Sequence, residues 1–236
     1  RLELKKLRFY PDEALRMIQI GLPAGLQSVI FNISNVMIQS SINSFGADVV
    51  AANTAAGNLD SFIYTACNSV YHASMTFTSQ NLGAGKYDRI RQGTRACNMI
   101  GLIYCCIHIL LALFTTRYAI WIFMSADEAQ SVLAYTQQMC NFVAFFSPLL
   151  LFVNVFRLSI QGMGYSRLSL ISGLLEMLAR TAVSLWAVPA FGFDAACLAS
   201  PLAWLLADCF LVPGFYGCLN ARRRQAARVR KELPEE

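Results

Sequence analysis

Three acidic residues stand inside long apolar runs of this sequence and are its first candidates for chemistry: Asp60, Glu176 and Asp208. An unpaired carboxylate surrounded by apolar groups costs several kcal/mol, or else it stays protonated. Such a group can take up and release a cation, either H⁺ or Na⁺. We therefore interpret these three acids as candidate cation-coupling residues.

Each acid also has a structural interpretation. Glu176 and Arg180 are four residues apart, so on a helix they can neutralise each other, and we predict that they form a structural pair. Asp208 could cap a neighbouring backbone or meet Arg180. Asp60 has no cation within one helical turn, which favours function, although it lies only about twelve residues into its apolar run and could sit near lipid headgroups. The groups that could share a cation with it are Asn58, Ser61 and Tyr64.

Polar residues recur at steps of three and four along two neighbouring apolar segments, so on helices each set shares one face. The first stripe is Ser28, Asn32, Asn35, Gln39 and Asn43, and the second is Thr54, Asn58, Ser61, Thr65, Asn68, His72, Thr76 and Ser79. At 1.5 Å per residue the second stripe is roughly 37 Å long, enough to cross a bilayer core of about 30 Å. Amides without partners are costly in hydrocarbon, so the stripes should face each other or shared water.

We predict that these stripes line a substrate cavity, with Asn32, Asn35, Gln39, Asn58, Thr65, Asn68 and His72 as lining residues. The alternative is that they only join helices, as polar side chains do in membranes.

The composition indicates an integral membrane protein. Hydrophobic residues make up 56% of the chain and charged residues 14%, against about 25% charged in soluble domains. A net charge of +5 would suggest nucleic acid in a soluble protein, but here the basic residues lie between and beyond apolar runs. We interpret them as topology signals, with the lipid bilayer and not nucleic acid as the partner.

The predicted fold is all-α, a polytopic membrane protein with six transmembrane helices. The expected parts are a cytoplasmic amphipathic linker over 1–13, a six-span unit over 14–220 and a basic cytoplasmic tail over 221–236. The spans end near 45, 81, 113, 160, 189 and 220, with a basic loop over 80–95 and an aromatic interfacial segment over 115–125. The sequence has neither an initiator Met nor a signal peptide, which suggests that it begins inside a longer protein.

Lys and Arg are divided unequally between the two sides of this layout. Seventeen fall on one side, when Arg157 and Arg167 are assigned to the turn after the fourth span, and only Arg117 falls on the other. This asymmetry places both termini in the cytoplasm. We expect the membrane to be the plasma (inner) membrane.

The remaining reactive residues indicate neither an enzyme nor a metal site. The eight cysteines form no CxxC pair and nearly all fall inside spans, as packing residues do. A lone buried histidine, such as His72 or His108, is more often a packing residue than a ligand. We find no compact set of acid, base and nucleophile, and we expect no cofactor apart from the coupling ion.

Three motifs carry a family resemblance: Gly21-Leu22-Pro23-Ala24-Gly25-Leu26-Gln27, Gln80-Asn81-Leu82-Gly83-Ala84-Gly85-Lys86, and Asn154-Val155-Phe156-Arg157 followed by Gln161-Gly162-Met163-Gly164. Their order and spacing resemble the second half of a multidrug and toxin compound extrusion (MATE) transporter. The resemblance implies one six-helix lobe of a two-lobe protein with a central cavity. It also implies export of amphipathic, often cationic drugs or toxins in exchange for H⁺ or Na⁺, with the N-terminal lobe as the missing partner.

The sequence departs from that family at one place. Some relatives carry acids midway along the helices that match the first and fourth spans, whereas here the first span offers Phe31, Asn32 and Asn35, and the fourth has no acid after Glu128. A Na⁺ site of that type is therefore not expected in this lobe. The alternatives are a lipid-linked precursor flippase of the same superfamily, disfavoured because Arg180 is the chief buried base, and a non-transporting membrane module.

Overall fold

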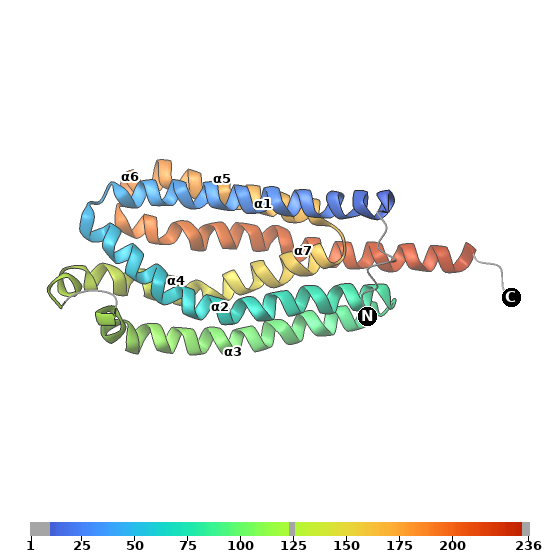
Figure 1. The fold of residues 1–236 in the computed structure, drawn as a ribbon, viewed down its shortest axis with the longest axis horizontal. Helices are drawn as coiled ribbons and strands as arrows, with labels where there is room; N and C mark the ends of the chain where they lie inside the picture. The colour runs from blue at the N-terminus through green and yellow to red at the C-terminus, as the bar shows by residue number, and fades with distance from the viewer. Residues whose placement is uncertain (1–9, 123–125, 233–236) are drawn as a thin grey trace.

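The chain forms six long helical rods, and each rod runs antiparallel to the one before it (Figure 1). The computed structural model describes residues 10–122 and 126–232. The elements in order are α1 (Pro11–Asn43), α2 (Ala47–Gly83), α3 (Tyr87–Ala119), the 3₁₀ turn η2 (Ile120–Ile122), α4 (Ala126–Gly162), α5 (Ser166–Ala182), the π turn η3 (Val183–Ala187), α6 (Val188–Phe191) and α7 (Phe193–Glu232). Elements α5, η3 and α6 follow without a gap and make the fifth rod. The predicted all-α, six-rod fold is confirmed.

The connections between rods are short because glycines end the helices. Gly85 and Gly164 have φ of 68° and 87°, a left-handed conformation that residues with a Cβ adopt at a cost. The chain therefore reverses within the three residues between α2 and α3, and again between α4 and α5. Both turns lie at the end of the bundle where α1 begins and α7 ends (Figure 1).

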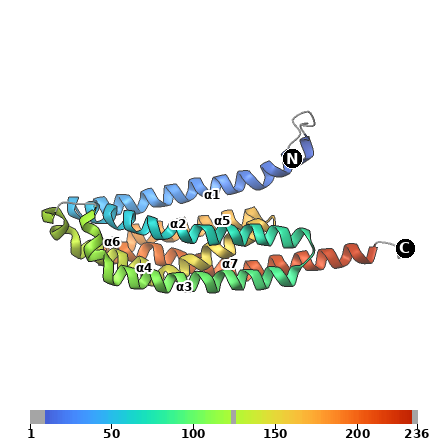
Figure 2. The same cartoon turned by 60° about the horizontal axis from the view of Figure 1, so that its bottom comes forward.

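The apolar core lies along α4 and α7. Its largest cluster joins Val153 and Ile160 of α4 to Leu211 and Phe215 of α7, with Ile90 of α3 against them. Helix α2 packs on α4 and α3, whereas α1 packs mainly on α5. Because of these different partners, α1 and α2 lie close at their shared turn and then separate along the bundle (Figure 2).

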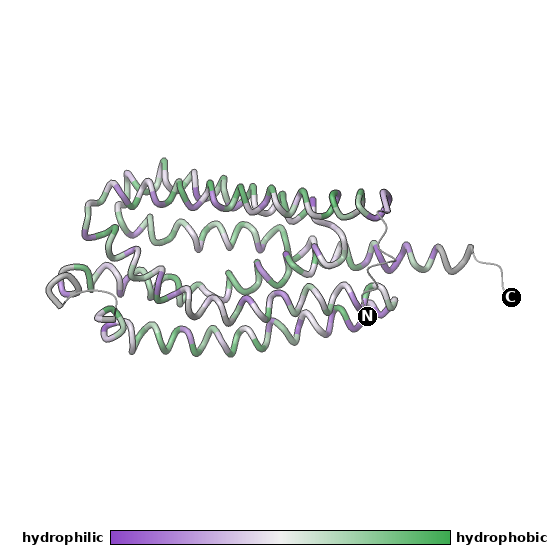
Figure 3. The backbone as a smooth tube through the Cα atoms, viewed as in Figure 1, coloured by the Kyte–Doolittle hydropathy of each residue, from purple (hydrophilic) through white to green (hydrophobic). Residues whose placement is uncertain are grey.

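Five of the rods are long and apolar enough to cross a membrane: α1, α3, α4, the fifth rod and α7. Helix α2 has the length, but its polar stripe keeps it outside this group. Figure 3 shows the middle of α7 as hydrophobic and its projecting C-terminal part as more polar. This part carries Arg222, Arg223, Arg224 and Arg228.

One predicted helix boundary and one predicted residue position are wrong. Helix α3 begins at Tyr87, not near Arg95, so most of the predicted basic loop over 80–95 is helical. Hydropathy marks where a helix enters hydrocarbon, whereas the helix itself continues into water. Arg157 is also misplaced by the sequence analysis, because it lies within α4 and is only 6% exposed. Both Tyr118 and Trp121 are well exposed, as expected of an aromatic interfacial segment, and Phe123 lies outside the described residues.

Candidate functional site

A pocket of about 390 Å³ opens between α1, α2, α4, α5 and α7 and collects most of the buried charge. Its polar lining includes Asn35, Asp60, Arg157, Glu176 and Arg180. We call it the polar pocket. Three of the residues predicted from the sequence, Asn35, Asp60 and Glu176, are thus brought together here from three different helices.

Helix α5 contributes to this pocket through a single buried face. Ser169, Ser172, Gly173, Glu176 and Arg180 recur at steps of three and four and are all buried. A Cβ at Gly173 would lie 3.1 Å from the Gln27 side chain of α1, so the glycine allows α1 to approach closely. The polar face of α5 therefore points into the bundle, toward α1 and α4.

Arg157 of α4 forms the ion pair of this pocket, and its partner is Glu176. Both side chains are buried, and the Arg157 Nε also donates a hydrogen bond to the Ser172 Oγ at 3.2 Å. The predicted pair between Glu176 and Arg180 is therefore wrong. Four-residue spacing lets two side chains on one helix meet, but here a guanidinium from a neighbouring helix reaches the carboxylate instead.

Arg180 is held by α1. Its Nη1 donates to the Asn35 Oδ1 at 2.8 Å and approaches the Ser34 Oγ at 3.5 Å, and its guanidinium lies 5.0 Å from the centre of the Phe31 ring. Among the described residues it has no carboxylate within ion-pair distance, and its Nε has no hydrogen-bond partner. Arg180 is thus a buried cation held by amides, hydroxyls and an aromatic ring.

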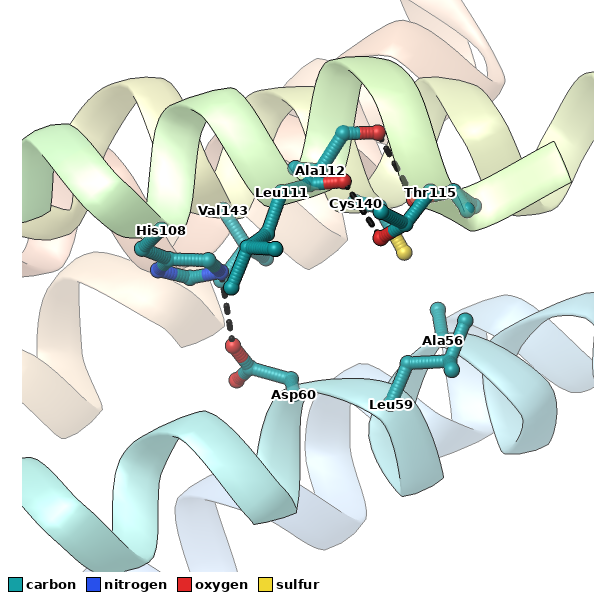
Figure 4. Close-up of a pocket in the computed structure, with 10 residues that line it drawn as sticks. Ala56, Leu59, Asp60, His108, Leu111, Ala112, Thr115, Cys140 and Val143 are labelled. Carbon is teal, nitrogen blue, oxygen red and sulfur yellow. Dashed lines mark hydrogen bonds and ion pairs between the residues drawn. The ribbon is translucent and has the colours of Figure 1, made fainter. Parts of the chain in front are cut away.

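Asp60 has a partner that spacing along its own helix could not reveal. Its Oδ1 lies 3.5 Å from the His108 Nε2 of α3, and Figure 4 shows the two side chains pointing toward each other between the helices. Asp60 lines the polar pocket on one side. On the other it lines a second pocket of about 190 Å³, with His108 and Thr115. We call this the histidine pocket.

Asp208 of α7 is buried, with 7% of the residue exposed, and neither carboxylate oxygen has a hydrogen-bond partner in the described part of the chain. The positive charge of Arg157 attracts this carboxylate electrostatically. Of the two partners considered from the sequence, a backbone group and Arg180, neither is present. Asp208 is therefore a buried acid whose carboxylate oxygens are unsatisfied in the described part of the chain.

The two polar stripes lie on open faces of α1 and α2. Asn32, Asn58, Thr65 and His72 are exposed, and Asn68 is half-buried. The two helices have few direct contacts, because α1 packs on α5 and α2 on α4, but Asn35 of the first stripe and Ser61 of the second line the same polar pocket. The one described hydrogen bond between the two helices joins the Asn53 Nδ2 to the Gln39 Oε1 at 3.0 Å, near their shared turn. The stripes are thus left for a partner or for water.

Sequence reasoning missed Arg157 and His108 as members of the site. The signal for Arg157 was present, because its neighbours Val155, Phe156 and Leu158 are apolar and place it within a span. His108 also lies in an apolar run, but no signal in the sequence reveals its partner, which lies 48 positions away on another helix.

The family model MatE matches residues 23–186, which is more than half of the chain. A curated relative, described as the probable multidrug resistance protein YpnP of Bacillus subtilis (strain 168), is 27% identical over 137 residues, covering 58% of this chain and 30% of the relative. The chain therefore spans about a third of that protein's length.

Solved structures show the same fold. An outward-facing multidrug resistance MATE family transporter of the MOP superfamily superposes with a TM-score of 0.85 at 15% identity, covering 94% of this chain and 50% of that one. An inward-facing structure gives a TM-score of 0.76 at 14% identity, covering 94% and 51%. The chain has the fold of one lobe, about half of these transporters.

Proposed function

Since the chain belongs to the MatE family, we propose that it forms one lobe of a secondary antiporter that exports amphipathic, often cationic drugs or toxins in exchange for H⁺ or Na⁺. The second lobe, which the solved transporters contain in addition, is the expected partner. Substrate and ion would share the space between the lobes.

The open polar stripes of α1 and α2 are the observation that carries this proposal. Polar groups facing hydrocarbon without partners cost several kcal/mol each, so lipid is a poor cover for Asn32, Asn58 and Thr65. A second lobe that encloses water and substrate would satisfy them. The polar pocket lies where α1 and α2 separate, so a compound in such a cavity would reach Asp60 and Asn35.

Among the three candidate acids, the contacts favour Asp60 and Asp208 over Glu176. Glu176 is neutralised by Arg157, and binding a cation at Glu176 would leave that arginine unpaired. Asp208 has no hydrogen bond to lose, and Asp60 lies in the pocket wall. A carboxylate couples ion and substrate if its two charge states favour different helix packings or ligands.

Orientation follows from the basic ends of the rods. Lys86 and Arg89 follow α2, Arg167 begins α5, and α7 ends in an arginine-rich segment. Since these segments lie at the end where α1 begins, we propose that both termini are cytoplasmic, in the plasma (inner) membrane.

A lipid-linked precursor flippase is the second candidate, and the buried Arg157 favours it more than the sequence did. A phosphate would need a strongly cationic cavity, however. Arg157 is neutralised by Glu176, which leaves Arg180 as the one unneutralised cation among the described residues that line the polar pocket. Export of cationic compounds remains the better supported proposal.

The experiment compares three plasmids in a drug-sensitive strain, which encode this chain, the two-lobe protein that contains it, or no insert. The two-lobe protein should confer resistance to cationic amphiphiles such as ethidium, whereas the lone lobe should not, because a cavity needs two walls. Equal resistance from the lone lobe would contradict the two-lobe proposal. Sensitivity in all three strains, with the protein present in the membrane, would contradict the export function.

A further inference from the structure

We propose that Asp60 and His108 together bind the coupling cation of this lobe, and that this cation is a proton and not Na⁺. The inference rests on the antiport function proposed above and names its ion. It is carried by the geometry of the histidine pocket in Figure 4.

The two residues form an enclosed pair between α2 and α3. The Asp60 Oδ1 and the His108 Nε2 are 3.5 Å apart, and the His108 side chain is only 9% exposed, against 34% for Asp60. A small movement would bring the two atoms into an ordinary hydrogen bond. His108 is therefore shielded from solvent, whereas Asp60 also lines the polar pocket.

The surroundings offer little to an alkali cation. The wall of the histidine pocket is largely apolar, formed by Ala56, Leu59, Leu111, Ala112 and Val143. Hard cations bind several oxygen ligands at once, whereas an imidazole nitrogen binds protons and transition metals. A Na⁺ ion in the histidine pocket, between Asp60 and His108, would thus meet mainly a nitrogen and hydrocarbon where it needs oxygens.

The hydroxyl protons near the pair are directed at backbone carbonyls. The Thr115 Oγ1 donates to the Leu111 carbonyl at 2.6 Å, and the Thr116 Oγ1 donates to the Ala112 carbonyl at 2.8 Å. The Ala112 carbonyl also accepts a hydrogen bond from the Gln137 Nε2 at 2.9 Å. Among the described residues that line the histidine pocket, the Asp60 carboxylate is the only charged oxygen ligand.

Few other charges face the pair. From α2, α3 and α4 it is surrounded by phenols and thiols, which carry no charge at neutral pH: Tyr64, Cys67, Tyr71, Tyr104, Cys105 and Cys140. Across the polar pocket lie the neutral pair of Arg157 and Glu176, and Arg180. From α1 and α7 the pocket receives no titratable group among its described lining residues.

Proton binding at this pair changes the charge of the cavity wall. With neutral imidazole and ionised carboxylate the pair carries −1, one bound proton makes it neutral, and a second makes it +1. A cationic substrate in the polar pocket is attracted by the first state and repelled by the last. Substrate and proton therefore compete for the same wall, as exchange requires.

The test uses the complete two-lobe transporter in liposomes, with ethidium as the probe, under a pH step at equal Na⁺ and under a Na⁺ step at equal pH. In the wild type the pH step should drive ethidium movement at least about tenfold faster than the Na⁺ step. Asp60→Asn should abolish the response to the pH step. His108→Gln, which keeps a polar side chain but cannot titrate, should change the proton concentration at half-maximal exchange by about tenfold.

Asp48→Asn is the matched control, because it makes the same change on the exposed first turn of α2 and should behave as the wild type. Proton release on ethidium binding in weakly buffered detergent is a second measurement for variants that do not transport. Wild-type protein should release protons and Asp60→Asn should not.

Exchange driven by Na⁺ alone would overturn the inference and leave the antiport function intact. An unchanged pH profile in His108→Gln would also overturn it, since a merely structural histidine would not set that profile. Ethidium movement under neither gradient would refute the proposed function instead.

Discussion

Breaking the buried ion pair should destabilise the lobe strongly. Glu176→Gln removes the carboxylate but keeps its shape, and it leaves the Arg157 guanidinium in a site where the residue is only 6% exposed. Ser172 still accepts one hydrogen bond, while Arg180 acts on Arg157 as a second positive charge. Removing one partner of a buried pair typically costs about 3–5 kcal/mol. We expect the lower end, about 3 kcal/mol, because a glutamine oxygen can still accept from Arg157.

The assay is thermal unfolding of the complete transporter in detergent, followed with a thiol-reactive fluorescent dye. Six of the eight cysteines are buried or half-buried, so unfolding exposes new thiols. A loss of about 3 kcal/mol corresponds to a Tm lower by roughly 6–12 °C for a unit of this size. The double variant Arg157→Met with Glu176→Leu should recover most of this loss, because it removes both charges.

Two results would refute this reasoning. One is a Glu176→Gln variant whose Tm lies within about 2 °C of the wild type, which would mean that Arg157 is solvated. The other is a double variant as unstable as the single one, which would mean that packing, and not the charge of Arg157, sets the cost.

Two further predictions concern topology and packing. Single cysteines at Ala84 and at Ala47, in a background without native cysteines, should label oppositely with an impermeant thiol reagent in intact cells. Only Ala47→Cys should react, because the two positions lie at opposite ends of α2. Labelling of Ala84→Cys alone would mean that the lobe has the opposite orientation in the membrane. Gly162→Ala should cost about 1–3 kcal/mol in a thermal unfolding assay, because its Cβ would lie 2.7 Å from the Met75 carbonyl oxygen. Gly83→Ala, which has open space around it, should be neutral or slightly stabilising, and equal stability of the two variants would contradict the close contact.

Periodicity and glycine placement were enough to predict the six rods. Apolar length and charge asymmetry are properties of each segment, so they can be read without knowing its neighbours. The ends of the rods were less predictable, as α3 shows. The charges of Asp88, Arg89 and Arg91 favour a loop, yet arginine is a good helix former and an aspartate stabilises the first turn of a helix, so α3 extends beyond the hydrocarbon.

The contacts of the site could not be predicted in the same way. The spacing of Glu176 and Arg180 predicts only that these side chains share a face of α5. It does not predict which helix packs on that face. The approach of α4, which brings Arg157, decided the pairing. The pairing of Asp60 with His108 also depends on how two helices pack. The stripes were correctly placed on helix faces, but no periodicity reveals what covers them.

The way α1 is attached connects the fold to the proposed exchange. Of its residues whose side chains are described, only Ser34 and Ile42 are buried, so apolar packing contributes little to its position. Polar contacts of Gln27, Asn35 and Gln39 link it instead to α4, α5 and α2.

A segment with few buried apolar contacts separates from a protein at a lower free-energy cost than its core. A polar contact can also be exchanged for a contact with water or ligand at little net cost, whereas apolar packing cannot. We therefore expect α1 to be the rod of this lobe that moves most readily. Because α1 supplies Asn35 and Phe31 to the polar pocket, its movement would change the same wall that Asp60 lines.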